Sequence, residues 1–447
     1  MKIEGEWHNK KQLFERVKTS LKKILIKIER TDFAEVFVML IIFLLVVIVA
    51  HFFIHRTFEE MVNSLVDWTM FSSALIASII TVFARAIKDW FYNRIEDDVK
   101  LELNVSELQR IYKDEAFEDA TALNNEHIKN GMIEGEGNAV IPIVCCAKFD
   151  SKTIIQIQDN ENSYYELPSF VEQNFSTLIS AHQSSNIYNN LNVRVKDWRF
   201  EDNQFLMETE RTFYLNSMAT NRAMDYELDG GLTVRRVLGQ GSKLVPLGNS
   251  RLSNHLGFNG MVESKDGMCP LVFRKKNVSI GKRTYGNSIG ASLKTKYALT
   301  DGVFSFFGLI NAVKNEIVDE LGIQKDLIGE IHFLNAYREV IEGGKPQLFF
   351  VTGIEKTALE IEQDFMKYQM KKNGNDEEKM ERDGDTLVWI KTEDIRNRML
   401  FFADHVTSNV SVFDGKKFNE ARHDLQMLPS ASGCMLFFQR YLARKND

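Results

Sequence analysis

The chain has 447 residues, a length that predicts two or three folding units, and its 62 acidic and 55 basic residues give a net charge of −7. Its composition, 44% hydrophobic and 26% charged, is ordinary for a soluble protein, but nearly all of the continuous apolar sequence lies before residue 90. The four cysteines form no C-x-x-C pair and have no histidine at metal-ligand spacing. They therefore favour buried, reduced thiols over a disulfide framework or a zinc site.

Two apolar segments near the N-terminus predict a hairpin of membrane-spanning helices. Val36–Ile54 contains His51 as its one polar residue, and a helix of this length spans roughly 28 Å at about 1.5 Å per residue. Trp68–Ala84 is shorter and contains serines and threonines, which a membrane helix tolerates because their hydroxyls bond to the backbone or to a neighbouring helix. An interfacial or buried helix is the alternative for this second segment.

Basic residues predict the orientation of this hairpin. The twenty residues before the first segment carry six Lys or Arg and the twenty after the second carry four, whereas the loop between the segments carries only Arg56. Positive charge stays on the cytoplasmic side, so we expect both termini in the cytoplasm.

Four regions follow from this organisation. They are a basic amphipathic segment at 1–32, the transmembrane hairpin at 33–87, an acidic helical linker at 88–137 and a cytoplasmic region at 138–447 with its core at about 190–447. Between Glu96 and Glu126 there are ten acidic and three basic residues, so we expect the linker to be a solvated helix. The sequence leaves open whether 139–190 form a separate domain.

The cytoplasmic region shows the pattern of a mixed α/β sandwich, in which strands, a glycine-rich loop, an acidic helix and a hairpin alternate. We expect a low-complexity surface loop at 371–385. The expected strands are 139–147, 153–157, 192–200, 204–208, 271–275, 331–341, 347–352 and 386–390, and the expected helices are 213–225, 312–323 and two that begin at 170 and 392.

The predicted helix at 312–323 carries three carboxylates on one face. Glu316, Asp319 and Glu320 stand at i, i+3 and i+4, and Gly322 is expected to end the helix. Carboxylates that converge within one turn repel each other unless a cation lies between them, and Mg²⁺ prefers oxygen ligands. The alternative is an acidic face that is simply solvated.

This stretch resembles the second half of the Nudix box, G-x5-E-x7-R-E-U-x-E-E-x-G-U, where U is aliphatic; the match runs over 315–323. In that family the acidic positions bind Mg²⁺ and assist the attack of water on a nucleoside diphosphate derivative. The resemblance implies that Glu316 and Glu320 are metal ligands and that Asp319 is a shortened third acid. It also implies a Nudix-like mixed α/β sandwich.

Other positions of the box differ from the family. Its arginine is Asn315, its upstream glutamate is Phe307, and its first glycine is Asp301, with Gly302 one place later. Because these groups are missing, the resemblance favours a domain that binds a ligand over an enzyme that hydrolyses one.

The order of the regions resembles the two-transmembrane–Nudix effectors of bacterial CBASS antiphage systems. This resemblance implies a multi-pass inner-membrane protein that binds a cyclic oligonucleotide made by a CD-NTase, forms a homo-oligomer and disrupts the bilayer, which causes abortive infection. No duplex nucleic acid is expected as a partner. The alternatives are a membrane-anchored, Mg²⁺-dependent Nudix hydrolase and a scaffold without a ligand.

Cations and amides around the glycine-rich loop are the predicted ligand contacts. Cations and amides suit phosphates and a tyrosine suits a base, although strands also often end in solvated Lys and Arg. The candidates are Arg274, Lys275 and Lys276 at the strand end and Arg283, Tyr285, Asn287 and Ser288 in the loop.

Overall fold

The computed structural model describes residues 101–129, 137, 139–182, 189–275, 278, 280–371 and 384–445. All of them belong to one structural unit, Lys100–Asp447. The predicted membrane segments at 36–54 and 68–84, with their end residues Val36, Ile54, Trp68 and Ala84, lie outside the described residues, as does most of the loop at 371–385.

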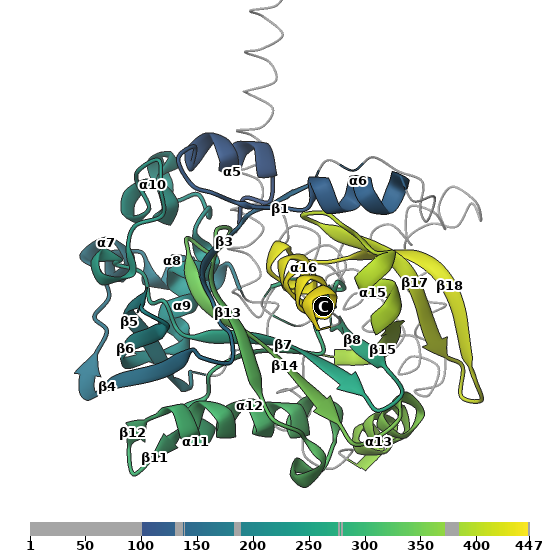
Figure 1. The fold of residues 1–447 in the computed structure, drawn as a ribbon. Coiled ribbons are helices and arrows are strands. Elements are labelled where there is room, and N and C mark those ends of the chain that lie inside the picture. Colours follow the sequence, from purple (N-terminus) through teal and green to yellow (C-terminus); the bar gives the residue numbers. More distant parts are fainter. Residues whose placement is uncertain are drawn as a thin grey trace, which may run out of the picture. The chain divides into compact units, whose positions relative to one another are not determined.

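A five-stranded mixed sheet lies at the centre of this unit (Figure 1). β7 and β14 run parallel to each other, and every other pair in the sheet is antiparallel. β13 and β14 form the hairpin that the sequence predicts. The strands, in spatial order, are β10 (Ile289–Ser292), β7 (Gly257–Ser264), β14 (Lys345–Ile354), β13 (His332–Glu339) and β3 (Ile143–Lys148).

A second sheet is antiparallel throughout and carries the most exposed strand of the region, β18 (Phe418–Gln426), on β17. β8 and β15 form its middle, and β9 is one of its edges. The strands, in spatial order, are β16 (Leu400–Phe401), β17 (His405–Phe413), β15 (Gly384–Lys391), β8 (Met268–Arg274) and β9 (Tyr285–Gly286).

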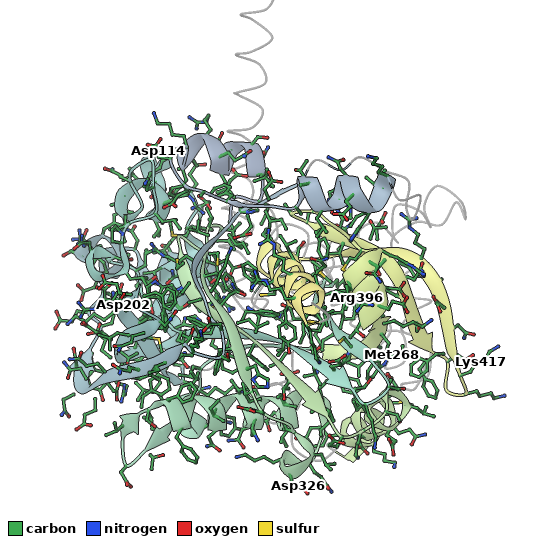
Figure 2. All side chains as sticks on the ribbon, in the orientation of Figure 1. Asp114, Asp202, Met268, Asp326, Arg396 and Lys417 are labelled. Carbon is green, nitrogen blue, oxygen red and sulfur yellow. The ribbon has the colours of Figure 1, made fainter. Side chains whose placement is uncertain are left out.

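Helix α16 (Pro429–Arg444) packs between these two sheets, and side chains fill the space around it (Figures 1 and 2). Twelve of its 16 residues are buried, among them Met435, Leu436 and Phe438. Its aromatic residue Phe437 contacts the rings of Tyr337 on β13 and Phe349 on β14, at centroid distances of 5.7 and 6.1 Å. Burial of each such ring removes a large apolar area from water, and α16 therefore joins the sheets into one core.

The opposite face of the central sheet is covered by α12 (Phe306–Leu321) and α13 (Ala358–Lys371). Ser305 caps α12 by accepting a hydrogen bond from the Gly308 N–H at 3.2 Å. Gly322 ends the helix as predicted, with a φ of 73° that suits glycine.

The remaining elements extend this frame. β4 pairs in parallel with β6, which pairs in antiparallel with β5, and this hairpin confirms the one predicted at 192–208. These elements are β4 (Ile154–Tyr164), β5 (Leu191–Glu201), β6 (Gln204–Phe213), β1 (Glu118–Asp119), β2 (Val140–Ile141), β11 (Leu299–Thr300), β12 (Val303–Phe304), α5 (Val105–Ile111), α6 (Thr121–Lys129), α7 (Ser169–Gln173), α8 (Phe175–Ser180), α9 (Tyr214–Ala219), α10 (Val234–Leu238), α11 (Thr295–Ala298) and α15 (Thr392–Asn397).

The predicted fold class, a transmembrane hairpin joined to a Nudix-like sandwich, is corrected by this architecture. The described region is a mixed α/β unit built on several sheets, and none of its helices is both long and apolar enough to cross a membrane. The physical reason is length: α12 and α16 have 16 residues each, which gives about 24 Å of helix against a hydrocarbon core of about 30 Å.

The described part of the predicted helical linker is also different from the expectation. Two short helices, α5 and α6, replace one continuous helix, and both are attached to the unit. Asn124 exchanges two hydrogen bonds with the backbone of Phe401, at 2.8 and 3.0 Å, and the Tyr112 hydroxyl accepts one from Arg235 at 3.0 Å. Residues after 138 also join the core, because β3 is an edge strand of the central sheet.

Close packing at the start of α12 provides a test of this arrangement. A Cβ at Gly308 would lie 1.9 Å from the backbone oxygen of Ala298, so Gly308→Ala forces α11 and α12 apart. We expect a loss of about 1–3 kcal/mol in the free energy of unfolding, in spite of alanine's better helix propensity. Urea unfolding measures it. Phe307→Ala, at a neighbouring residue that is 73% exposed, is the control and should change stability by less than about 0.5 kcal/mol.

Candidate functional site

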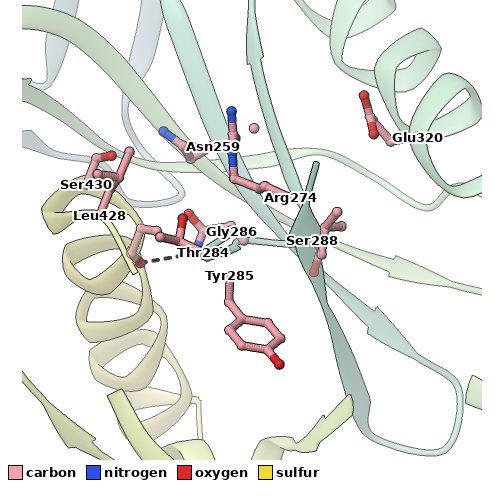
Figure 3. A pocket seen from close by; sticks show the side chains of 13 residues that line it. Asn259, Arg274, Thr284, Tyr285, Gly286, Ser288, Glu320, Leu428 and Ser430 are labelled. Atoms are coloured by element: carbon pink, nitrogen blue, oxygen red, sulfur yellow. Dashed lines mark hydrogen bonds between the residues drawn. The ribbon is translucent and has the colours of Figure 1, made fainter. Parts of the chain in front are cut away.

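A pocket opens where the start of α16 meets the edge strands β9 and β10 (Figure 3). Its cavity volume is about 40 Å³. Arg274 lies between the start of α16 on one side and Glu320 of α12 on the other. The pocket therefore collects side chains from β7, β8, β9, α12 and α16, which are far apart in the sequence.

The chain between β9 and β10 crosses from one sheet to the other and builds the pocket wall. Tyr285 and Gly286 pair with β8, whereas Ile289–Ser292 pair with β7. At the crossing, the Ser288 hydroxyl donates to the Pro270 carbonyl at 2.6 Å and accepts from the Val262 N–H at 3.1 Å. One buried hydroxyl thus links a strand of each sheet.

Glycine at position 290 keeps the pocket open beside Arg274. A Cβ there would lie 3.0 Å from Asn259 Oδ1 and 4.0 Å from the Arg274 guanidinium. Any larger residue would therefore fill the space in front of the guanidinium.

The pocket favours an anionic group near Arg274. The first turn of α16 contains no acidic residue, and no side chain caps its N-terminus at Leu428. The partial positive charge of a helix N-terminus attracts anions, and the Arg274 guanidinium adds a full charge with fork-shaped donors. Glu320 is the one carboxylate that lines the pocket.

Asn287 adds a buried polar group to the same wall. It is 3% exposed, and its Nδ2 donates to the Ala431 carbonyl at 3.1 Å. Its Oδ1 has no hydrogen-bond partner among the described residues. A buried acceptor without a partner costs about 1–3 kcal/mol, so a ligand that donates a hydrogen bond here would gain from it.

Behind the pocket lies a buried carboxyl group, Glu339, which is 2% exposed. Its pKa is raised to about 7, chiefly by burial and then by the neighbouring carboxyl of Glu342, against the opposing effect of Lys345. Gln347 Nε2 donates to it at 2.9 Å, and the hydroxyl of Ser430, which lines the pocket, also hydrogen-bonds to it. The start of α16 is thus tied to a group that titrates near neutral pH.

This raised pKa predicts a specific pH dependence of stability. A carboxyl with a pKa near 4.5 when unfolded and about 7 when folded binds its proton more tightly in the native state. The free energy of unfolding should therefore fall as pH rises from about 4.5 to about 7, by up to about 1.4 kcal/mol per pH unit. Glu339→Gln should reduce this fall, part of which remains because burial also raises the pKa of Glu362 and Asp394, whereas Glu355→Gln, at an exposed position, should retain all of it. Urea unfolding at several pH values measures both; an unchanged slope in Glu339→Gln would contradict the assignment.

The structure brings four of the seven predicted ligand residues to the pocket: Arg274, Tyr285, Asn287 and Ser288. The Tyr285 ring, however, points away from Arg274 and lies 5.0 Å from the ring of Phe273 (Figure 3).

The other three predicted ligand residues do not line the pocket. Lys275 follows β8 but is not part of the wall, and Arg283 is exposed in a turn with a φ of 55°. Lys276 lies outside the described residues.

The three predicted metal ligands face different partners. Glu316 is 1% exposed and forms an ion pair with the Lys294 ammonium at 3.1 Å. Asp319 accepts a hydrogen bond from the Tyr297 hydroxyl at 2.6 Å, and Glu320 lines the pocket. Among the described residues, no group of three or more His, Cys, Asp or Glu side chains is arranged to hold a metal ion.

Sequence reasoning missed the groups that complete this site. Lys294 lies 22 residues before Glu316, and Asn259 and Ser430 belong to elements that the fold alone brings together. Lys294 and Tyr297 lie between the glycine-rich loop and the acidic helix. That position was the one feature of the sequence that could have indicated a contact with the acidic residues.

The Lys294–Glu316 pair can be tested by removing its cation. Lys294→Met leaves a buried carboxylate without this ammonium, so we expect a loss of about 3–5 kcal/mol in the free energy of unfolding. The double variant Lys294→Met/Glu316→Gln should recover most of the loss. Lys296→Met, at an exposed neighbour, is the control for the loss of one lysine. If Lys294→Met and the double variant lost the same free energy of unfolding, the ion pair would not account for the stability.

Comparisons with known proteins add little to this description. No family model matches the chain, and no curated protein matches it. Among solved structures, the crystal structure of DR0079 from Deinococcus radiodurans is similar at 13% identity over 31% of this chain and 68% of that chain, with a TM-score of 0.20. A likeness at that score carries no argument about fold or function.

Proposed function

We propose that the described unit is a sensor that binds a cyclic nucleotide at the pocket beside Arg274 and does not hydrolyse it. The observation that carries this proposal is that positively charged groups face the pocket, whereas most of the predicted catalytic acids do not. A guanidinium and an uncapped helix N-terminus face the pocket, whereas two of the three acids needed for hydrolysis are engaged by Lys294 and Tyr297.

Each polar group has a role in this proposal. Arg274 binds a phosphate oxygen through its fork of N–H donors, and the start of α16 stabilises the same charge. Asn287 Oδ1, which has no hydrogen-bond partner among the described residues, accepts a hydrogen bond from a base or a sugar hydroxyl. A cavity of about 40 Å³ holds one such group, so the rest of the ligand lies over the pocket mouth.

The wider role follows from the resemblance to CBASS effectors. In this proposal a CD-NTase supplies the cyclic oligonucleotide, and binding changes the association of the units in a homo-oligomer. The action on the bilayer that the sequence predicts depends on residues outside the described range and stays a prediction.

Binding by the purified full-length chain tests the proposal. We expect one member of a panel of cyclic di- and trinucleotides to raise the unfolding temperature; a ligand at 100 times its Kd stabilises by about 2.7 kcal/mol. Arg274→Ala should weaken that binding at least tenfold, and Arg274→Lys should restore only part of it because an ammonium lacks the planar fork. Calorimetric titration measures each Kd.

The control is Arg422→Ala, which removes the same charge from the exposed strand β18 and should leave Kd within twofold. Each variant must unfold at the wild-type temperature without ligand. Equal Kd values for Arg274→Ala and wild type would contradict the proposal. Recovery of a cleaved nucleotide, lost in Glu320→Gln, would instead support the hydrolase, since Glu320 lines the pocket.

A further inference from the structure

A second cavity, of about 60 Å³, opens beside the other end of α16. Its wall includes Lys148 at the end of β3, Asn335 of β13 and four residues of α16 (Phe437, Arg440, Tyr441 and Arg444). Ser430 and Arg444 are fourteen residues apart on one helix, which places this cavity about 21 Å along the axis from the pocket beside Arg274. The two cavities are therefore distinct.

The lining of this cavity is basic. It contains Lys148, Arg440 and Arg444 and no carboxylate. Arg440 is balanced by Glu118, whose carboxylate lies 2.5 Å from it, but among the described residues no carboxylate lies within ion-pair distance of Lys148 or Arg444. Like charges gathered around one cavity repel each other, and an anion between them would relieve the repulsion.

The helix dipole explains only part of this arrangement. Cations at the last turn of α16 interact favourably with its partial negative charge, which accounts for Arg444. Lys148 comes from a different element, and the dipole gives no reason for its position at the same cavity.

The remaining walls are aromatic and amide. Phe149 is 7% exposed, Tyr441 is half-buried, and Asn335 is 7% exposed, with its Nδ2 donating to the Cys145 sulfur at 3.4 Å. Apolar rings beside cations suit an organic molecule that carries an anionic group. The volume, about twice the share of one water in the liquid, admits a group of about the size of a phosphate.

We propose that this cavity is a second ligand site, which binds the phosphate group of a phosphorylated molecule between Lys148 and Arg444, with the organic part against Phe149 and Tyr441. The phosphate can belong to a soluble phosphate ester or to a phospholipid headgroup, and the chemistry of recognition is the same. This proposal does not depend on the proposed function of the Arg274 pocket.

The test measures the binding of pyrophosphate by calorimetry with the purified full-length chain that carries Arg274→Ala, so that the first pocket does not contribute. A parallel arm measures flotation with vesicles of phosphatidylcholine and phosphatidylglycerol at a ratio of about four to one. We expect Lys148→Ala/Arg444→Ala to weaken binding at least tenfold, and higher salt to weaken the parent protein's binding.

Lys416→Ala/Lys417→Ala is the matched control, because it removes the same charge from the turn between β17 and β18, away from α16 (Figure 2). It should leave binding within twofold. The single variant Lys148→Gln changes an exposed residue and should fold like the parent protein. It should also weaken binding, though less than the double variant does. Loss in the pyrophosphate arm assigns a soluble ligand, and loss in the vesicle arm alone assigns a phospholipid. Equal binding by the double variant and the control, or no binding of either probe by the parent protein, would overturn the proposal.

Discussion

The structure depends on the burial of one helix between two sheets. α16 is buried at 12 of its 16 positions, and strands of both sheets contribute side chains to the apolar cluster around it. Phe437 illustrates the constraint, since its ring contacts two strands of the central sheet at once. Because interiors are close-packed, the spacing of the two sheets is set by the width of this helix.

That spacing also decides where polar groups can gather. The end of a buried helix brings backbone N–H groups into the interior, where an uncapped terminus needs partners. Arg274, Asn287 and Ser430 line the pocket at the start of α16, and Ser430 hydrogen-bonds to the buried Glu339. The pocket is thus a direct result of ending an apolar helix between two sheets rather than at the surface.

The carboxylates of helix α12 follow the spacing of a metal site, but the fold gives them other partners. Glu316 and Glu320 stand one turn apart, as a metal site requires, yet the fold places a lysine from another element against one of them. A lysine ammonium and a metal ion both neutralise a buried carboxylate, and sequence spacing alone does not distinguish them.

Local elements of the fold could be predicted and its long-range arrangement could not. The hairpin of β13 and β14 and the glycine end of α12 at Gly322 were confirmed because both depend on residues close in sequence. The helix α16 was not predicted at all, although twelve of its residues are buried and it lies between the two sheets. Of the candidate site, Arg274 and Asn287 were predicted from residue chemistry, whereas Asn259, Lys294 and Ser430 depend on contacts between distant segments.

The position of α16 in the chain has a consequence for how the protein is made. This helix follows every strand that it covers, so both sheets must remain open on their inner faces until its last turn has left the ribosome. Tyr337, Phe349 and the other inner residues stay exposed to water during that interval, which favours capture by chaperones over early folding. For the same reason, a protease that removed α16 would uncover the apolar residues of both sheets at once, and the shortened chain would be cleared as an unfolded protein rather than persist as a partly active one.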